Sequence, residues 1–114
     1  MFSEGDRQRL SDIRDNVARI RRFLGSMSLA EFERNEMAYF AVVHSLLIIS
    51  EAARHLSDDV KARHPEIDWV AIRDSGNVYR HAYFSVTEMR IWETANLHLP
   101  ALEKVVLSEL ANAG

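Results

Sequence analysis

The chain has 114 residues, a length that fits one compact domain and leaves little room for a second. Its 14 basic and 17 acidic residues give a formal charge of −3, which argues against a protein that coats nucleic acid through a basic surface. The absence of cysteine excludes disulfides, thiolate catalysis and cysteine-bound metals, and it favours a reducing, cytoplasmic setting.

No segment of the sequence predicts a secretion signal or a membrane span. The first residues include the charged Glu4 and Arg7 and lack the apolar core of a signal peptide. The longest apolar run, residues 38–49, is shorter than the roughly 20 residues that cross a bilayer, and His44 and Ser45 interrupt it. We therefore expect a cytoplasmic protein that makes no membrane contact.

The first predicted helix has apolar residues at spacings of three and four, which place them on one face: Leu10, Ile13, Val17, Ile20 and Leu24. Gly25 can end this helix in a left-handed conformation. Ser28 and Glu31 have the spacing of a capping box, so a second helical stretch is expected to begin near Leu29.

The next predicted helix, over about 37–56, is apolar on two sides. One stripe contains Val42, Leu46, Ile49, Ala53 and Leu56, and the neighbouring stripe contains Phe40, Val43 and Leu47. A helix of this kind needs burial on both sides, inside a bundle or across a dimer contact, and we therefore expect a homodimer. His44 is expected to be a hydrogen-bonded core residue or to line that contact.

Two more helices are expected in the second half of the chain. Asp68 is a good N-cap for a helix that extends to about Phe84, and Ser85 or Thr87 can cap the last helix. The last helix carries a stripe of Trp92, Ala95, Leu99, Leu102 and Val106, and Pro100 predicts a kink in the preceding turn. No segment alternates with the period of a strand, so the fold class is all-α: an antiparallel four-helix bundle with a short extra helix.

Polar and aromatic residues interrupt the helix over 69–86, which reads WVAIRDSGNVYRHAYFSV. Asn77 and His81 lie four residues apart on one face, and Gly76, Arg80 and Tyr83 lie on the adjacent face. Such a group suits phosphodiester chemistry, because an imidazole can take a proton from a ribose 2′-hydroxyl and a guanidinium can hold phosphate oxygens.

The alternative interpretation is an ordinary polar helix face. In that case His81 caps the helix or bonds to a neighbour, and Arg80 pairs with an acid such as Asp74. A metal centre is not expected, because the five histidines contain no H-x-H or H-x-x-x-H pair: His44, His55, His64, His81 and His98.

Four landmarks together resemble one known family over nearly the whole chain. They are SLLIISEAARHLS at 45–57, ARHPEIDW at 62–69, the N-x-x-x-H-x-Y core at Asn77, His81 and Tyr83, and IWETANLHLPALEKVV at 91–106. This combination resembles the HepT-like branch of the HEPN superfamily, small helical proteins encoded beside a minimal nucleotidyltransferase. The resemblance implies a homodimeric four-helix bundle and a ribonuclease that cleaves RNA without metal or cofactor, at a site where two copies of the motif meet.

The resemblance also implies a toxin–antitoxin pair. An MntA-like nucleotidyltransferase antitoxin would silence the ribonuclease by transferring AMP to the motif tyrosine, here Tyr83. Within the motif, His81 would be the general base, Arg80 would stabilise the transition state, and Asn77 would orient the phosphate or the imidazole.

The sequence departs from the family motif at one position. The family reads R-N-x-x-x-H-x-Y, and this chain has Gly76 in place of the arginine. We expect Arg80, one turn further along the helix, to fold back into open volume above Gly76 and supply the cation. Arg73 is a secondary candidate for that cation. The competing hypothesis is a degenerate member that binds the nucleotidyltransferase and does not cleave RNA.

Overall fold

The computed structural model describes residues 3–82 and 85–112, which contain helices and no strands. The long helices are α1 (Glu4–Leu24), α3 (Glu36–Arg54), α5 (Trp69–His81) and α7 (Leu99–Asn112). Two short helices, α2 (Leu29–Glu33) and α4 (Asp58–Ala62), lie in the connections, and α6 (Glu88–Glu93) and a π-helix, η2 (Thr94–His98), lead into α7. The predicted all-α class is confirmed.

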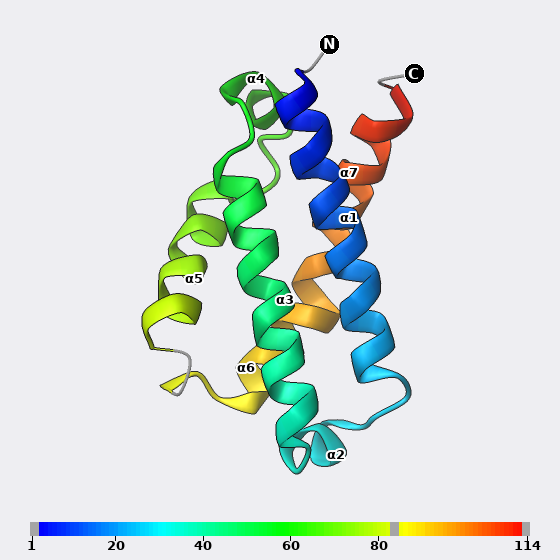
Figure 1. Cartoon of the computed structure of the whole chain (residues 1–114), viewed down its shortest axis with the longest axis vertical. Helices are drawn as coiled ribbons and strands as arrows, with labels where there is room; N and C mark the ends of the chain where they lie inside the picture. The colour runs from blue at the N-terminus through cyan, green and yellow to red at the C-terminus, as the bar shows by residue number, and fades with distance from the viewer. Residues whose placement is uncertain (1–2, 83–84, 113–114) are drawn as a thin grey trace.

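The four long segments run antiparallel to their neighbours in the chain, and the two ends of the chain lie at the same end of the bundle (Figure 1). α3 packs against α1 on one side and against α5 on the other, while α7 packs against α1. The apolar face of α1 that was predicted from its spacing is buried from Leu10 to Leu24. The predicted bundle is therefore confirmed, with α5 as an outer helix held mainly by α3.

Local signals place the first helix ends where expected. Gly25 ends α1 with a positive φ of 52°, and its N–H donates to the carbonyl of Arg21, but its ψ of −127° differs from the left-handed helical conformation that was predicted. Ser28 and Glu31 form the predicted capping box at the start of α2, because each side chain accepts a hydrogen bond from the other residue's backbone N–H.

The distortion predicted before Pro100 takes the form of the π-helix η2, Thr94–His98. Proline lacks an N–H and its ring crowds the carbonyl four residues earlier, so a regular α-helical turn cannot form there. A widened turn relieves that crowding while the helix continues into α7.

The second apolar stripe of α3, on its outer face, is buried only in part. Val43 is buried, whereas Leu47 is half-buried and Phe40 keeps 45% of its surface exposed. His44 is exposed, so its expected place in the core is wrong and a place at a subunit contact stays a prediction. α3 is also long and apolar enough to cross a membrane, but 56% of that segment is buried inside the bundle, as suits a central helix.

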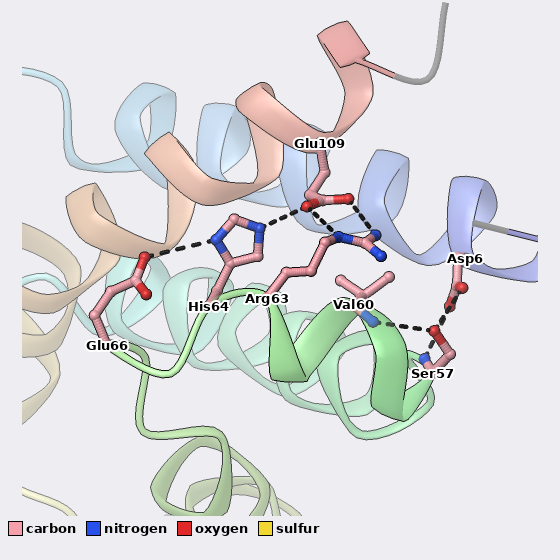
Figure 2. Close-up of polar contacts among 7 residues, drawn as sticks. All are labelled: Asp6, Ser57, Val60, Arg63, His64, Glu66 and Glu109. Atoms are coloured by element: carbon pink, nitrogen blue, oxygen red, sulfur yellow. Dashed lines mark hydrogen bonds and ion pairs between the residues drawn. The ribbon is translucent and has the colours of Figure 1, made fainter. Parts of the chain in front are cut away.

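A buried carboxylate joins the end of α7 to the segment after α4 (Figure 2). Glu109 accepts hydrogen bonds from Arg63 Nε at 3.1 Å and Nη2 at 2.7 Å, and its Oε2 lies 2.6 Å from His64 Nε2. The bonds from Arg63, helped by His64, outweigh partial burial and lower the pKa of Glu109 to about 2. This carboxylate therefore stabilises the fold in its ionised form.

Acid should destabilise the protein through Glu109. Its pKa is lower in the folded chain, about 2, than the ordinary value of 4.5, so between those values the unfolded state binds a proton that the folded state does not. The free energy of unfolding should therefore fall as the pH drops from about 5 to about 2, by about 2 kcal/mol from this group once solvent screening of the partly exposed Arg63 is allowed for. Urea denaturation of the wild type and Glu109→Gln across that range measures the effect. Equal acid sensitivity of the two proteins would contradict it.

Candidate active site

The contact between α5 and α3 decides which side chains of α5 remain accessible. Gly76 and Tyr79 are buried on the inner side of α5, and Ser50 Oγ on α3 donates to the carbonyl oxygen of Ile72 at 2.9 Å. Asn77 and His81 lie on the exposed side. α3 therefore fixes the rotation of α5 so that the polar motif faces outward.

Gly76 packs directly against α3. A Cβ atom built on Gly76 would lie 2.9 Å from Ser50 Cβ, closer than such atoms pack in proteins. The expected open volume above this glycine is therefore wrong, since α3 occupies it. The same Cβ would lie 3.9 Å from Arg80 Nη1, so the Arg80 side chain does fold back toward position 76.

Substituting Gly76 with alanine should destabilise the fold by about 1 kcal/mol. The overlap with Ser50 costs roughly 1–3 kcal/mol and exceeds the gain of up to about 1 kcal/mol from better helix propensity. Gly5→Ala in α1 is the matched control, because its new Cβ meets Ser3 Oγ at an ordinary 3.6 Å and should not destabilise. Chemical denaturation measures both. Equal or greater stability of Gly76→Ala would show that α3 does not constrain this position.

Arg80 is held by two side chains. Its Nη1 donates to Glu51 Oε1 on α3, and its Nη2 donates to Asn77 Oδ1 at 2.7 Å. The predicted alternative partner, Asp74, instead accepts hydrogen bonds from Arg73, whose Nη2 lies 3.1 Å from Asp74 Oδ1. Arg80 therefore does pair with an acid, as the alternative interpretation expected, but that acid is Glu51 rather than Asp74. The structure brings Arg80 rather than Arg73 to Asn77.

His81 is the last residue of α5 and is exposed. Within residues 3–82 and 85–112 its ring makes no hydrogen bond, so the structure places it beside the Asn77–Arg80 pair without joining it to them. The predicted continuation of this helix to about Phe84 is wrong, because Ala82 leaves helical geometry with φ −145° and ψ 31°. Tyr83, the expected AMP acceptor, lies outside the described residues.

Glu51 is a residue of this site that the sequence reasoning missed. Its second oxygen, Oε2, lies 3.7 Å from Arg54 Nη1 and 3.9 Å from His55 Nε2. A signal did exist in the sequence: residues 37–50 contain no Asp, Glu, Lys or Arg, and Glu51 ends that run. Such a carboxylate beside an apolar helix face is expected to have a cationic partner.

A model of the family described as "Ribonuclease HepT-like" matches residues 13–108, which include Asn77, Arg80 and His81. The chain belongs to the ribonuclease HepT-like family. A protein of Thermococcus cleftensis named as a probable ribonuclease HepT is 32% identical over 94 residues, covering 82% of this chain and 86% of the relative. No solved structure shows a significant match.

Proteins named as RNases in two other organisms are similar to this HepT-like chain. One from Methanocaldococcus jannaschii is 28% identical over 97 residues, covering 85% of this chain and 89% of the relative. One from Caldanaerobacter subterraneus is 34% identical over 80 residues, covering 70% and 71%.

The part of the HepT-like chain that the structure describes contains no group of three or more His, Asp or Glu side chains able to hold a metal ion. The groups near the end of α5 are instead an imidazole, a guanidinium, an amide and one carboxylate. These groups can transfer a proton and bind an anion, which are the two operations needed for cleavage of a phosphodiester.

Proposed function

We propose that the HepT-like chain is an endoribonuclease that works without a metal ion. His81 takes the proton of a ribose 2′-hydroxyl, and the 2′-oxygen attacks the adjacent phosphorus. The bond from phosphorus to the 5′-oxygen breaks, the leaving oxygen takes up a proton, and the products carry a 2′,3′-cyclic phosphate and a 5′-hydroxyl. Arg80 binds the phosphate oxygens as negative charge builds up on them.

The observation that carries this proposal is the joined pair of Arg80 and Asn77 on the accessible side of α5, next to His81. Arg80 Nη2 bonds to Asn77 Oδ1 at 2.7 Å, and 30% of the arginine side chain is exposed to solvent. An anion arriving from outside can therefore reach a guanidinium whose position is already set. The relatives named as RNases support a ribonuclease activity.

Incubation of the purified chain with RNA in excess EDTA tests this function. We expect cleavage that continues in the chelator and is lost in His81→Ala. Cleavage that EDTA stops would contradict the metal-free reaction, whereas an intact RNA in every condition would favour the second candidate, a helical partner that binds a nucleotidyltransferase without cleaving RNA. The observation that favours this second candidate is Gly76 at the position of the family arginine.

The proposed enzyme is a homodimer whose two motifs face each other. Support comes from the outer face of α3, where Phe40 is 45% exposed and Leu47 and Ile48 are half-buried. A second copy can cover this face, and the expected species in light scattering has twice the 13.1 kDa mass of the chain. A 13.1 kDa species at micromolar concentration would contradict both the dimer and a site shared between its subunits.

We further propose that an MntA-like nucleotidyltransferase silences the enzyme by attaching AMP to Tyr83. The tyrosine follows His81 by two residues, so its added phosphate and base would block the approach to Arg80 by charge and by volume. Co-expression with the neighbouring nucleotidyltransferase should add the mass of one or more AMP groups, and Tyr83→Phe should abolish the addition. An unchanged mass with a demonstrably active partner would exclude the modification.

A further inference from the structure

The contact between Arg80 and Glu51 joins α5 to α3 at the edge of the proposed active site. Glu51 lies on α3, 29 residues before Arg80 in the chain, and its Oε1 accepts from Arg80 Nη1. Both side chains are partly exposed, 30% for Arg80 and 37% for Glu51. The carboxylate thus borders the surface from which a phosphate would approach.

Two side chains restrict the guanidinium. Glu51 binds Nη1 and Asn77 binds Nη2, and Nη1 lies within ordinary contact distance of position 76, 3.9 Å from where a Cβ would be. A guanidinium has five N–H groups, and these two contacts use two of them. Three N–H groups therefore remain for phosphate oxygens while the side chain is held.

The surrounding charges leave the cluster attractive to an anion. Oε2 of Glu51 faces Arg54 at 3.7 Å and His55 at 3.9 Å, so one carboxylate lies among two arginines and an imidazole. Even with His55 neutral, these groups sum to one positive charge. Glu51 can therefore fix Arg80 without cancelling the field that binds phosphate.

We propose that Glu51 is a positioning residue for the reaction, acting through Arg80. A free arginine side chain samples many rotamers and loses conformational entropy when it is fixed. Holding the side chain before the substrate arrives removes this entropy loss from the reaction step. The carboxylate on α3 and the amide on α5 hold the guanidinium beside position 76, at which the family motif has its arginine. This role rests on the proposed ribonuclease function.

Steady-state cleavage by Glu51→Gln tests the role of Glu51. The variant keeps an acceptor of similar size but loses the charge that holds Arg80, so kcat should fall roughly 10- to 100-fold with little change in KM. Its unfolding temperature should stay near that of the wild type, because a partly exposed ion pair adds little stability. Asp74→Asn is the matched control, since it breaks an arginine–carboxylate pair on α5 that does not include Arg80, and it should keep wild-type kcat.

A double variant separates positioning from a general structural effect. In the Arg80→Ala background, Glu51→Gln should cause no further loss of kcat, because the group through which Glu51 acts is gone. Full activity of Glu51→Gln, a gain of activity, or an additive loss in the double variant would each overturn the role of Glu51 and leave the ribonuclease function standing. A wild type that cleaves no RNA would overturn the ribonuclease function and, with it, this inference.

Discussion

Replacing His81 with alanine should lower kcat for RNA cleavage by roughly 10²- to 10⁴-fold, the usual loss when a general base is removed. Among residues 69–82, the described part of this segment, His81 carries the one imidazole, the side-chain type best suited to take the proton from the 2′-hydroxyl. The fold should not change, because His81 is exposed and ends its helix. Cleavage kinetics together with circular dichroism and the unfolding temperature measure both effects.

His98→Ala is the matched control for this experiment. His98 is another exposed histidine, at the end of the π-helix η2, and the proposed reaction gives it no role. It should cleave RNA at the wild-type rate. If His81→Ala were folded and fully active, His81 could not be the general base and the chemistry proposed for this motif would be wrong.

Replacing Arg80 with alanine should lower kcat by roughly 10²- to 10³-fold, the loss typical of one donor that stabilises charge in the transition state. Arg80→Lys should restore part of the rate, because an ammonium keeps the charge but cannot bond to Glu51, Asn77 and phosphate in the fixed geometry of a guanidinium. Single-turnover kinetics with saturating enzyme separate this effect from weaker RNA binding.

Arg73→Ala is the comparison that decides which arginine supplies the cation. Arg73 is 55% exposed and paired with its neighbour Asp74, so its loss should leave kcat close to that of the wild type. Inactivation by Arg73→Ala, with Arg80→Ala still active, would show that the cation has been assigned to the wrong residue.

The helices could be predicted well because their signals are local. The apolar spacing of α1, the positive φ at Gly25 and the capping box of Ser28 and Glu31 all act within a few residues. The end of α5 was misplaced for the opposite reason, since the helical pattern continues past His81 whereas the backbone turns at Ala82. Spacing alone cannot locate an end that is not marked by a cap, glycine or proline.

The sequence predicted only those features of the site that lie within a single helix. The sequence placed Asn77 and Arg80 on adjacent faces of one helix, and the structure joins their side chains by a hydrogen bond. The contacts with α3 could not be derived in this way, because Glu51 and Ser50 reach α5 only through tertiary packing. Gly76 was therefore interpreted as open space, whereas α3 packs against it.

The most direct test of the proposed reaction removes the attacking oxygen from the substrate. An RNA oligonucleotide with a single 2′-deoxyribose immediately 5′ of the cleaved bond is incubated with the wild-type chain in EDTA, beside the same RNA with the deoxyribose one nucleotide further along. The proposed mechanism predicts no cleavage at the first substitution and normal cleavage of the second RNA, with products ending in a 2′,3′-cyclic phosphate and a 5′-hydroxyl. Cleavage at the bond that lacks its 2′-hydroxyl would contradict it.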